Sequence, residues 1–292
     1  MSLPFTQSGV APSGAAMKGD RKMSQVVLVT GTSSGFGRAI ADALHLRGYS
    51  VFGTTRRPSP AADPVAYRVV PLDVDSESSV TEGVVEVLRQ AGRLDALINN
   101  AGLGYAGAIE DTTVEEARRQ FETNFFGMHR MCRAVLPHMR ERRAGRIVNM
   151  SSLGGLVSVP FQAMYCASKF AVEAYTEALR METRPFGIRV SMVEPGDYAT
   201  GFTANRRMTA ASTAASPYAE RCGIAVQRMA EDESSNADVG PVVRATIKAL
   251  ETASPRLRYP AASAMQRVQV ALRPFLPQSL FEYLVADYYG VR

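Results

Sequence analysis

The amino-acid sequence predicts an α/β fold, in which a doubly wound parallel sheet has helices on both faces. Short segments rich in Val, Ile and Leu alternate with longer segments of helical pattern through the first two thirds of the chain. That alternation builds parallel sheets through right-handed crossovers. The apolar segments do not alternate with polar residues, as is typical of strands buried on both faces. A glycine-rich turn joins the first apolar segment to the first helical one.

Composition narrows the class of protein. The chain has 292 residues, of which 46% are hydrophobic and 21% charged, so it is predicted to be globular. Its net charge of +5 comes from arginines scattered along predicted helices, and we expect no nucleic-acid partner. Three cysteines without a C-x-x-C spacing and three separated histidines predict neither a disulfide framework nor a metal site.

No apolar run reaches the roughly 18 residues that a membrane-spanning helix needs. Residues 1–24 are rich in Gly, Ser and Ala, and they lack the hydrophobic segment of a secretion signal. We therefore expect a flexible tail over 1–24, no membrane span and a cytoplasmic location.

The glycine-rich turn predicts a nucleotide-binding loop. It follows an expected strand at 25–30 and precedes an expected helix at 38–47. Glycines let the backbone approach a pyrophosphate, and the helix N-terminus supplies oriented N–H groups. The spacing is G-x-x-x-G-x-G, and an ordinary glycine-rich loop is the alternative. The loop residues expected to contact a cofactor are Gly31, Ser33, Ser34, Gly35, Phe36 and Gly37.

The end of the second expected strand, 49–54, indicates which dinucleotide is bound. An acidic residue there would accept hydrogen bonds from a free ribose 2′-hydroxyl. Thr55 stands in that place and Arg56 and Arg57 follow it. Arginine suits a phosphate, so the residues favour NADP(H) over NAD(H), with Arg56 as the contact. Two solvent-exposed arginines without a ligand are the alternative.

Further strands are expected at 67–72, 94–99 and 145–150, with a short edge strand at 256–259. Asp73 and Val74 follow the third strand, where the adenine should lie. A helix is expected at 76–90 with Ser76 as its N-cap. A long helical stretch is expected over 114–140, and Pro137 is expected to kink or end it.

Three side chains after the strand at 145–150 predict acid–base chemistry. Ser152 follows that strand directly, and Tyr165 and Lys169 stand one helical turn apart. An ammonium beside a phenol should lower the pKa of Tyr165, so that it exchanges a proton near neutral pH. An ordinary amphipathic helix is the alternative.

Taken together, these motifs resemble the classical short-chain dehydrogenases/reductases. Five motifs occur in order over roughly residues 24–200: Thr30-Gly31-(x)3-Gly35-x-Gly37, Asn99-Asn100-Ala101-Gly102, Asn124, Ser152 with Tyr165-(x)3-Lys169, and Pro195-Gly196 with Thr200. The stretches YCASKFAVEA and RPFGIRVSMVEPG look most like the 17β-hydroxysteroid and retinol dehydrogenase-like branch. The resemblance implies a single Rossmann-type sheet of about seven strands.

The resemblance also implies a role for each motif. Tyr165 would be the general acid or base, and Lys169 would lower its pKa and bind the nicotinamide ribose. Ser152 would bind the substrate oxygen, and Asn124 would hold a water in a proton relay. Further cofactor contacts would come from Asn99, Asn100, Ala101, Gly102, Pro195, Gly196 and Thr200, besides Tyr165 and Lys169 themselves.

Two residues depart from the family pattern. Ser34 stands where members that prefer NADP often have a basic residue, so the NADP(H) prediction depends mainly on Arg56. Asp197 follows Pro195-Gly196, beside the expected nicotinamide site, and its role stays open. One interpretation is that it caps the next helix.

The last third is expected to determine substrate choice. We expect a domain over 25–260, a substrate lid within it at 201–236, a helix at 240–251, and a helical extension over 261–292. The alternative to a lid is that residues 201–236 form a surface insertion. The extension reads as two short amphipathic helices, which would serve core or dimer packing, a pocket wall or a membrane-surface contact. The predicted apolar pocket residues are Leu103, Tyr105, Leu153, Val159, Phe161, Met164, Tyr198 and Phe202.

These observations predict an NADP(H)-dependent oxidoreductase that interconverts a lipophilic ketone or aldehyde and its alcohol. Steroids, retinoids and other bulky apolar compounds fit the expected pocket. A 3-oxoacyl-thioester reductase and a non-catalytic NADP(H)-binding sensor are the alternatives. The resemblance implies a homodimer or homotetramer.

Overall fold

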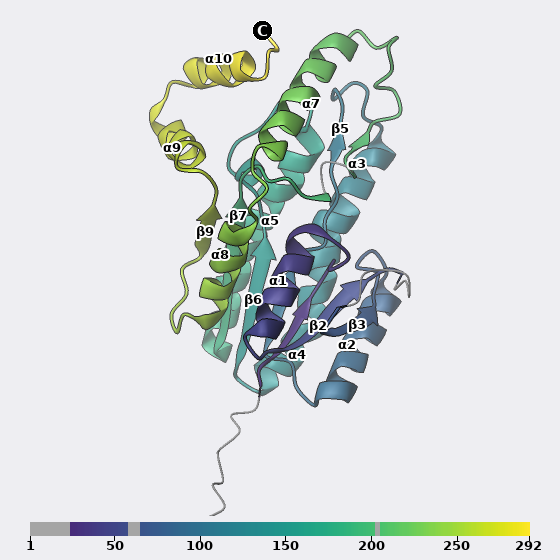
Figure 1. Cartoon of the computed structure of the whole chain (residues 1–292), viewed down its shortest axis with the longest axis vertical. Coiled ribbons are helices and arrows are strands. Elements are labelled where there is room, and N and C mark those ends of the chain that lie inside the picture. The colour runs from purple at the N-terminus through teal and green to yellow at the C-terminus, as the bar shows by residue number, and fades with distance from the viewer. Residues whose placement is uncertain (1–23, 58–64, 202–204) are drawn as a thin grey trace, which may run out of the picture.

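The computed structural model describes residues 24–57, 65–201 and 205–292. Its centre is a sheet of seven parallel strands in the order β3-β2-β1-β4-β6-β7-β9 (Figure 1). The strands are β1 (Val26–Val29), β2 (Ser50–Thr55), β3 (Arg68–Pro71), β4 (Ala96–Asn99), β6 (Gly145–Met150), β7 (Ile188–Pro195) and β9 (Arg258–Ala261). The predicted fold class is confirmed. The order of strands reverses between β1 and β4, and sheets of this type bind ligands at that point.

Alternate side chains of each strand serve two separate cores. On β1, Val27 and Val29 pack into one core with Ile40 and Leu44 of α1 (Gly35–Leu46). That face is also covered by α8 (Gly240–Glu251), which contacts α1.

On the other face of β1, Val26 and Leu28 pack with Met131 and Val135 of α4 (Met128–Glu141). Residues of α2 (Glu77–Ala91) and α5 (Ala163–Thr183) belong to the same core. Because both faces of the sheet are buried at its centre, β1 and β4 are apolar at successive positions, which explains the pattern seen in the sequence.

The long helical stretch expected over 114–140 is interrupted, but not at Pro137. It consists of α3 (Val114–Phe121), a π-helical turn η1 (Glu122–Gly127) and α4, which passes through Pro137 and ends at Glu141. A proline removes one backbone donor, and α4 is held in place by its buried face rather than by that hydrogen bond. The irregularity therefore lies at Asn124.

The other predicted elements lie within a few residues of those observed. Ser76 caps α2 by accepting a hydrogen bond from the Ser79 backbone N–H, as expected. The helix expected at 240–251 has those bounds in the structure, while the edge strand β9 begins two residues later than predicted.

In the last third of the chain, α7 and the C-terminal helices lie toward the carboxyl ends of the strands, whereas α8 and β9 belong to the body of the sheet (Figure 1). A short strand β8 (Arg207–Met208) pairs with β5 (Tyr105–Ala106), and α7 (Ala219–Ser234) follows. After β9 come α9 (Ala264–Leu272), η4 (Arg273–Phe275) and α10 (Gln278–Tyr288). The 3₁₀ turns η2 (Leu153–Gly155) and η3 (Arg184–Phe186) precede and follow α5.

The extension is thus helical, as expected, and α7 makes the lid region more helical than the sequence suggested. None of the helices in the described part of the chain combines the length and apolarity needed to cross a bilayer. Residues 1–23 of the predicted tail (1–24) and the predicted pocket residue Phe202 lie outside the described residues.

Candidate active site

A cavity of about 1250 Å³ lies at the carboxyl ends of β1, β2, β4, β6 and β7. One part is lined by the glycine-rich loop and by residues that follow β2, β3 and β4. The other part is lined by α5, α7 and the C-terminal helices α9 and α10. The cavity thus joins the predicted cofactor site to the predicted substrate site.

The glycine-rich loop has a conformation that its glycines permit. Gly31 and Gly35 have φ values of +70° and +58°, in the region that side chains disfavour. A Cβ on Gly37 would lie 2.2 Å from the Gly31 carbonyl oxygen and 2.4 Å from Nδ2 of Asn100. The same Asn100 Nδ2 donates to the Thr30 and Gly31 carbonyl oxygens at 2.9 and 3.0 Å. The loop after β4 therefore holds the loop after β1 in shape.

Most of the predicted cofactor residues line the cavity. Gly37 instead serves the packing of the loop, and Asn99 is buried with its Nδ2 donating to Oδ1 of Asn149 at 2.9 Å. Gly35 and Phe36, at the N-terminus of α1, face the cavity, and the Ser34 side chain forms no capping hydrogen bond there. These residues fit the phosphates of a dinucleotide, which bind well at a helix N-terminus. The predicted residues that line the cavity are Gly31, Ser33, Ser34, Gly35, Phe36, Arg56, Asp73, Val74, Asn100, Ala101, Gly102, Tyr165, Lys169, Pro195, Gly196 and Thr200.

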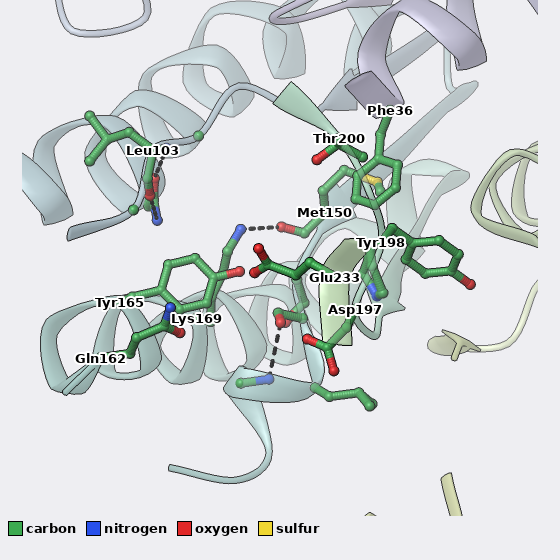
Figure 2. A pocket seen from close by; sticks show the side chains of 18 of the residues that line it. Phe36, Leu103, Met150, Gln162, Tyr165, Lys169, Asp197, Tyr198, Thr200 and Glu233 are labelled. Carbon is green, nitrogen blue, oxygen red and sulfur yellow. Dashed lines mark hydrogen bonds between the residues drawn. The ribbon is translucent and has the colours of Figure 1, made fainter. Parts of the chain in front are cut away.

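The four predicted catalytic side chains come together at this cavity. Ser152 lies at the start of η2, and the Tyr165 hydroxyl is hydrogen-bonded to its side chain. Lys169 is buried, and its Nζ donates to the Met150 carbonyl oxygen at 2.8 Å (Figure 2). The same Nζ lies 5.9 Å from the centre of the Tyr165 ring. Asn124 completes the set from η1.

Burial controls the acid–base state of this pair. It raises the pKa of Tyr165 above its usual value, and the hydrogen bond from Ser152 offsets only part of that rise. Burial lowers the pKa of Lys169 to about 8, against the opposing effect of Glu173. The predicted lowering of the Tyr165 pKa is therefore wrong for this structure, because burial of the hydroxyl outweighs the stabilisation of its phenolate. The phenol is protonated at neutral pH and can donate a proton.

Asn124 is held by hydrogen bonds that use its whole amide. Its Oδ1 accepts from the Leu103 N–H at 2.9 Å, and its Nδ2 donates to the Leu103 carbonyl oxygen and to Oγ of Ser168, both at 3.1 Å. These bonds place the Leu103 segment beside the cavity and connect it to α5. A π-helical turn within an α-helix is frequently found at a functional site.

The predicted pocket residues divide into two groups. Those that line the cavity are Leu103, Leu153, Val159 and Tyr198. Tyr105, Phe161 and Met164 lie outside its lining. Phe161 packs instead beside a small core that includes Ala225 and Met229, with a φ of +61°.

Sequence reasoning missed much of the substrate end. Glu233 of α7 and Gln266 of α9 line it, and Asp197, whose role stayed open, does so too. Glu233 carries no sequence signal, because neighbouring acids on the same helix make it look like part of a solvated face. Part of the extension lines the cavity, which fits the pocket-wall interpretation. Its apolar lining residues are Val270, Leu272, Leu276, Phe281, Leu284 and Val285.

Comparison with known proteins identifies the family. Residues 25–211 match the short chain dehydrogenase family model, and the chain belongs to this family of oxidoreductases. The 3-ketodihydrosphingosine reductase of Bacteroides thetaiotaomicron is 39% identical over 92% of this chain and 99% of its own.

Solved structures show the same fold. A short-chain dehydrogenase from Streptomyces avermitilis is 34% identical, with a TM-score of 0.75, over 92% of this chain and 97% of its own. A Burkholderia phymatum family member in complex with NAD is 26% identical, with a TM-score of 0.75, over 86% of this chain and 93% of its own. ElxO with NADP bound is 26% identical, with a TM-score of 0.57, over 64% and 87%. The family thus binds a nicotinamide dinucleotide, and both forms occur among these structures.

Proposed function

We propose that the protein is an NADP(H)-dependent reductase of lipophilic ketones or aldehydes, with Tyr165 as the general acid. One observation carries the proposal. The protonated Tyr165 hydroxyl, hydrogen-bonded to Ser152, stands where the cofactor part of the cavity meets an apolar wall. A carbonyl oxygen placed there meets two hydroxyl groups, as carbonyl reduction requires.

Each side chain of the site has a task in this reaction. Bound in the cavity, the dinucleotide supplies the hydride that the carbonyl carbon accepts. Tyr165 donates its proton to the carbonyl oxygen, and Ser152 donates a hydrogen bond to the same oxygen as negative charge develops. The Lys169 ammonium stabilises the phenolate left on Tyr165. Asn124 holds the Leu103 segment against α5 beside the reacting atoms.

The preference for NADP(H) is supported by charge at the end of β2. Thr55, Arg56 and Arg57 all line the cavity, and both arginines are exposed to it. No carboxylate occupies the position after β2 that would repel a 2′-phosphate.

The substrate class is supported by the wall of the cavity. Its C-terminal helices contribute aliphatic and aromatic side chains, which suit a long or polycyclic hydrocarbon. The relative from Bacteroides is named for 3-ketodihydrosphingosine, a long-chain amino ketone, and this favours a long-chain ketone over a compact one. A sensor without catalysis would not need all four catalytic side chains at one cavity.

The test is consumption of NADPH and NADH with a panel of carbonyl compounds. The panel contains long-chain ketones with and without an amino group, a steroid ketone, retinal, a 3-oxoacyl thioester and a small aryl ketone. We expect turnover with NADPH on the long lipophilic members. Tyr165→Phe should lower it by at least about a hundredfold, the usual contribution of a general acid, while NADPH binding is kept. Full activity of this variant, or no turnover of any member, would overturn the proposal.

A further inference from the structure

Two carboxylate side chains, those of Asp197 and Glu233, line the cavity at its substrate end. Asp197 follows β7 and Glu233 lies on α7, so they come from segments far apart in the chain. Figure 2 shows both carboxyl groups on the side of the cavity toward which the Tyr165 hydroxyl points. Both also act electrostatically on Tyr165. A charged group on a substrate held at Tyr165 would therefore interact electrostatically with both carboxylates.

The two carboxylates differ in how they are partnered. Glu233 forms an ion pair with Arg206, and the two side chains are only 11% and 4% exposed. Asp197 instead accepts a hydrogen bond from Nε2 of Gln266, at 2.5 Å from its Oδ2. Among the described residues Asp197 forms no salt bridge, so one negative charge lacks a paired cation here.

The other groups around Asp197 do not supply that cation. Arg206 acts on Asp197 from a distance, but its charge is already matched by Glu233. Asp232 adds a further negative potential, and Tyr289 is a neutral phenol. Asp197 is partly exposed to the cavity, and a bound substrate would remove it from water, where a carboxylate without a cation is costly. A cationic ligand would remove the cost, whereas an anionic ligand would add to it.

We propose that Asp197, together with Glu233, binds the ammonium group of the substrate, so that the enzyme prefers a lipophilic ketone with an amino group close to its carbonyl. The inference rests on the proposed function, because it places the substrate carbonyl at Tyr165. The ammonium then lies against Asp197, and the hydrocarbon chain runs along Leu276, Phe281 and Leu284 of the wall. The carboxylates recognise the ammonium group of the substrate by its charge, and the wall of the cavity recognises the hydrocarbon chain by its apolar surface.

The preference should depend on pH. Burial first, and then Glu233 and Asp232, raise the pKa of Asp197 to about 6. Asp197 is therefore charged above pH 6 and neutral below it. Discrimination in favour of the amine should grow as the pH rises through 6, and it should fade as the pH falls below that value.

The experiment compares three substrates that differ only in charge near the carbonyl. They are a long-chain α-amino ketone, its N-acetyl derivative and the matching ketone without nitrogen, each assayed with NADPH. Asp197→Asn removes the charge but keeps an acceptor for Gln266. Asp232→Asn is the control, because it removes a similar charge from α7 at a residue that does not line the cavity.

We expect the wild type to favour the amino ketone over both analogues in kcat/KM. Asp197→Asn should reduce that ratio by at least about tenfold, a modest share of what removing one partner of a buried charge pair costs. Asp232→Asn should leave it within about twofold, as expected for a charge that does not touch the ligand. Equal ratios in the wild type and Asp197→Asn would overturn the inference, and turnover of the nitrogen-free ketone would then leave the proposed function intact.

A binding measurement decides the matter even if no ketone is reduced. A saturated long-chain primary amine should raise the Tm of the wild type, and the matching alcohol should raise it less. The gain from the amine should be smaller in Asp197→Asn than in Asp232→Asn. The same gain in both variants would overturn the ammonium site independently of catalysis.

Discussion

At the scale of single residues, burial is the main influence on the charged groups of the cavity. Lys169 and Tyr165 are both held away from water, and each shifts toward its neutral form. An arrangement of residues in the sequence shows which charges are near each other, but not how deeply they are buried. For this reason the pair was placed correctly from the Tyr-x-x-x-Lys spacing, while the direction of the Tyr165 pKa shift was not.

Arg56 is the residue on which the cofactor proposal depends most. If it contacts the 2′-phosphate, Arg56→Ala should raise the Kd for NADPH on the order of 10- to 100-fold, as expected for a lost charge-assisted hydrogen bond. The Kd for NADH should change by less than about threefold, because its ribose carries no phosphate there.

Arg57→Ala is the matched control, since Arg57 is also exposed and also lines the cavity. Because the chain has no tryptophan, titration of the nicotinamide fluorescence of each reduced cofactor measures both constants. An equal loss of NADPH and NADH affinity in Arg56→Ala would contradict the assignment.

At the scale of elements, the glycine loop and α1 form one packed unit. At Gly37, an added Cβ would meet backbone and an amide that is already hydrogen-bonded, so neither can move aside easily. Gly37→Ala should therefore shift α1 away from the loop and cost about 1–3 kcal/mol, the usual cost of overpacking. NADPH binding should weaken in parallel, because α1 supplies the N–H groups for the phosphates.

Gly223→Ala provides the opposite case. Gly223 lies in α7 with nothing within 4 Å of an added Cβ. There the substitution should stabilise the protein by about 0.5–1 kcal/mol, because alanine favours a helix. Chemical unfolding of both variants measures the two free energies. A Gly37→Ala protein as stable as Gly223→Ala would show that the loop does not depend on this close packing.

The elements show what a sequence can predict and where it stops. The strands at 25–30, 94–99 and 145–150 were expected from short continuous apolar runs, because strands buried on both faces do not alternate. The helix at 240–251 was expected from its helical pattern, whereas β7 was not predicted as a strand. The π-helical turn at Asn124 was not predicted either, since its residues keep a helical pattern across the interruption. The long stretch was therefore expected to break at Pro137, where composition suggests it, rather than at η1, where the contacts with Leu103 require it.

At the scale of the whole molecule, the C-terminal extension closes the site that the sheet begins. The predicted catalytic and cofactor residues lie at the carboxyl edge of the sheet, on η1 and on α5, and their order along the chain was sufficient to predict that they come together. The wall of the pocket comes from residues a hundred positions later. Only the fold brings the catalytic residues and the C-terminal helices together. From the sequence, a pocket wall was therefore one of several possible roles of the extension, beside core packing and dimer packing.

The two half-exposed leucines of α10 allow this role to be tested. Leu284 lines the cavity and Leu280 does not, yet their exposed fractions are close, at 48% and 43%. Leu284→Asn should raise KM for a long-chain ketone about tenfold, since a buried leucine side chain contributes roughly 1.5–3 kcal/mol. The kcat of Leu284→Asn should stay the same as that of the wild type, because the hydrocarbon chain of the substrate makes the same contact in the ground state and in the transition state.

Leu280→Asn should have the same effect on the Tm and none on KM. A small aryl ketone, which does not reach α10, should show little change with either variant. If both leucines changed KM equally, the loss would reflect a general weakening of α10 and not contact with the substrate. If neither did, the hydrocarbon chain would have to leave the cavity by another route, and the extension would serve packing alone.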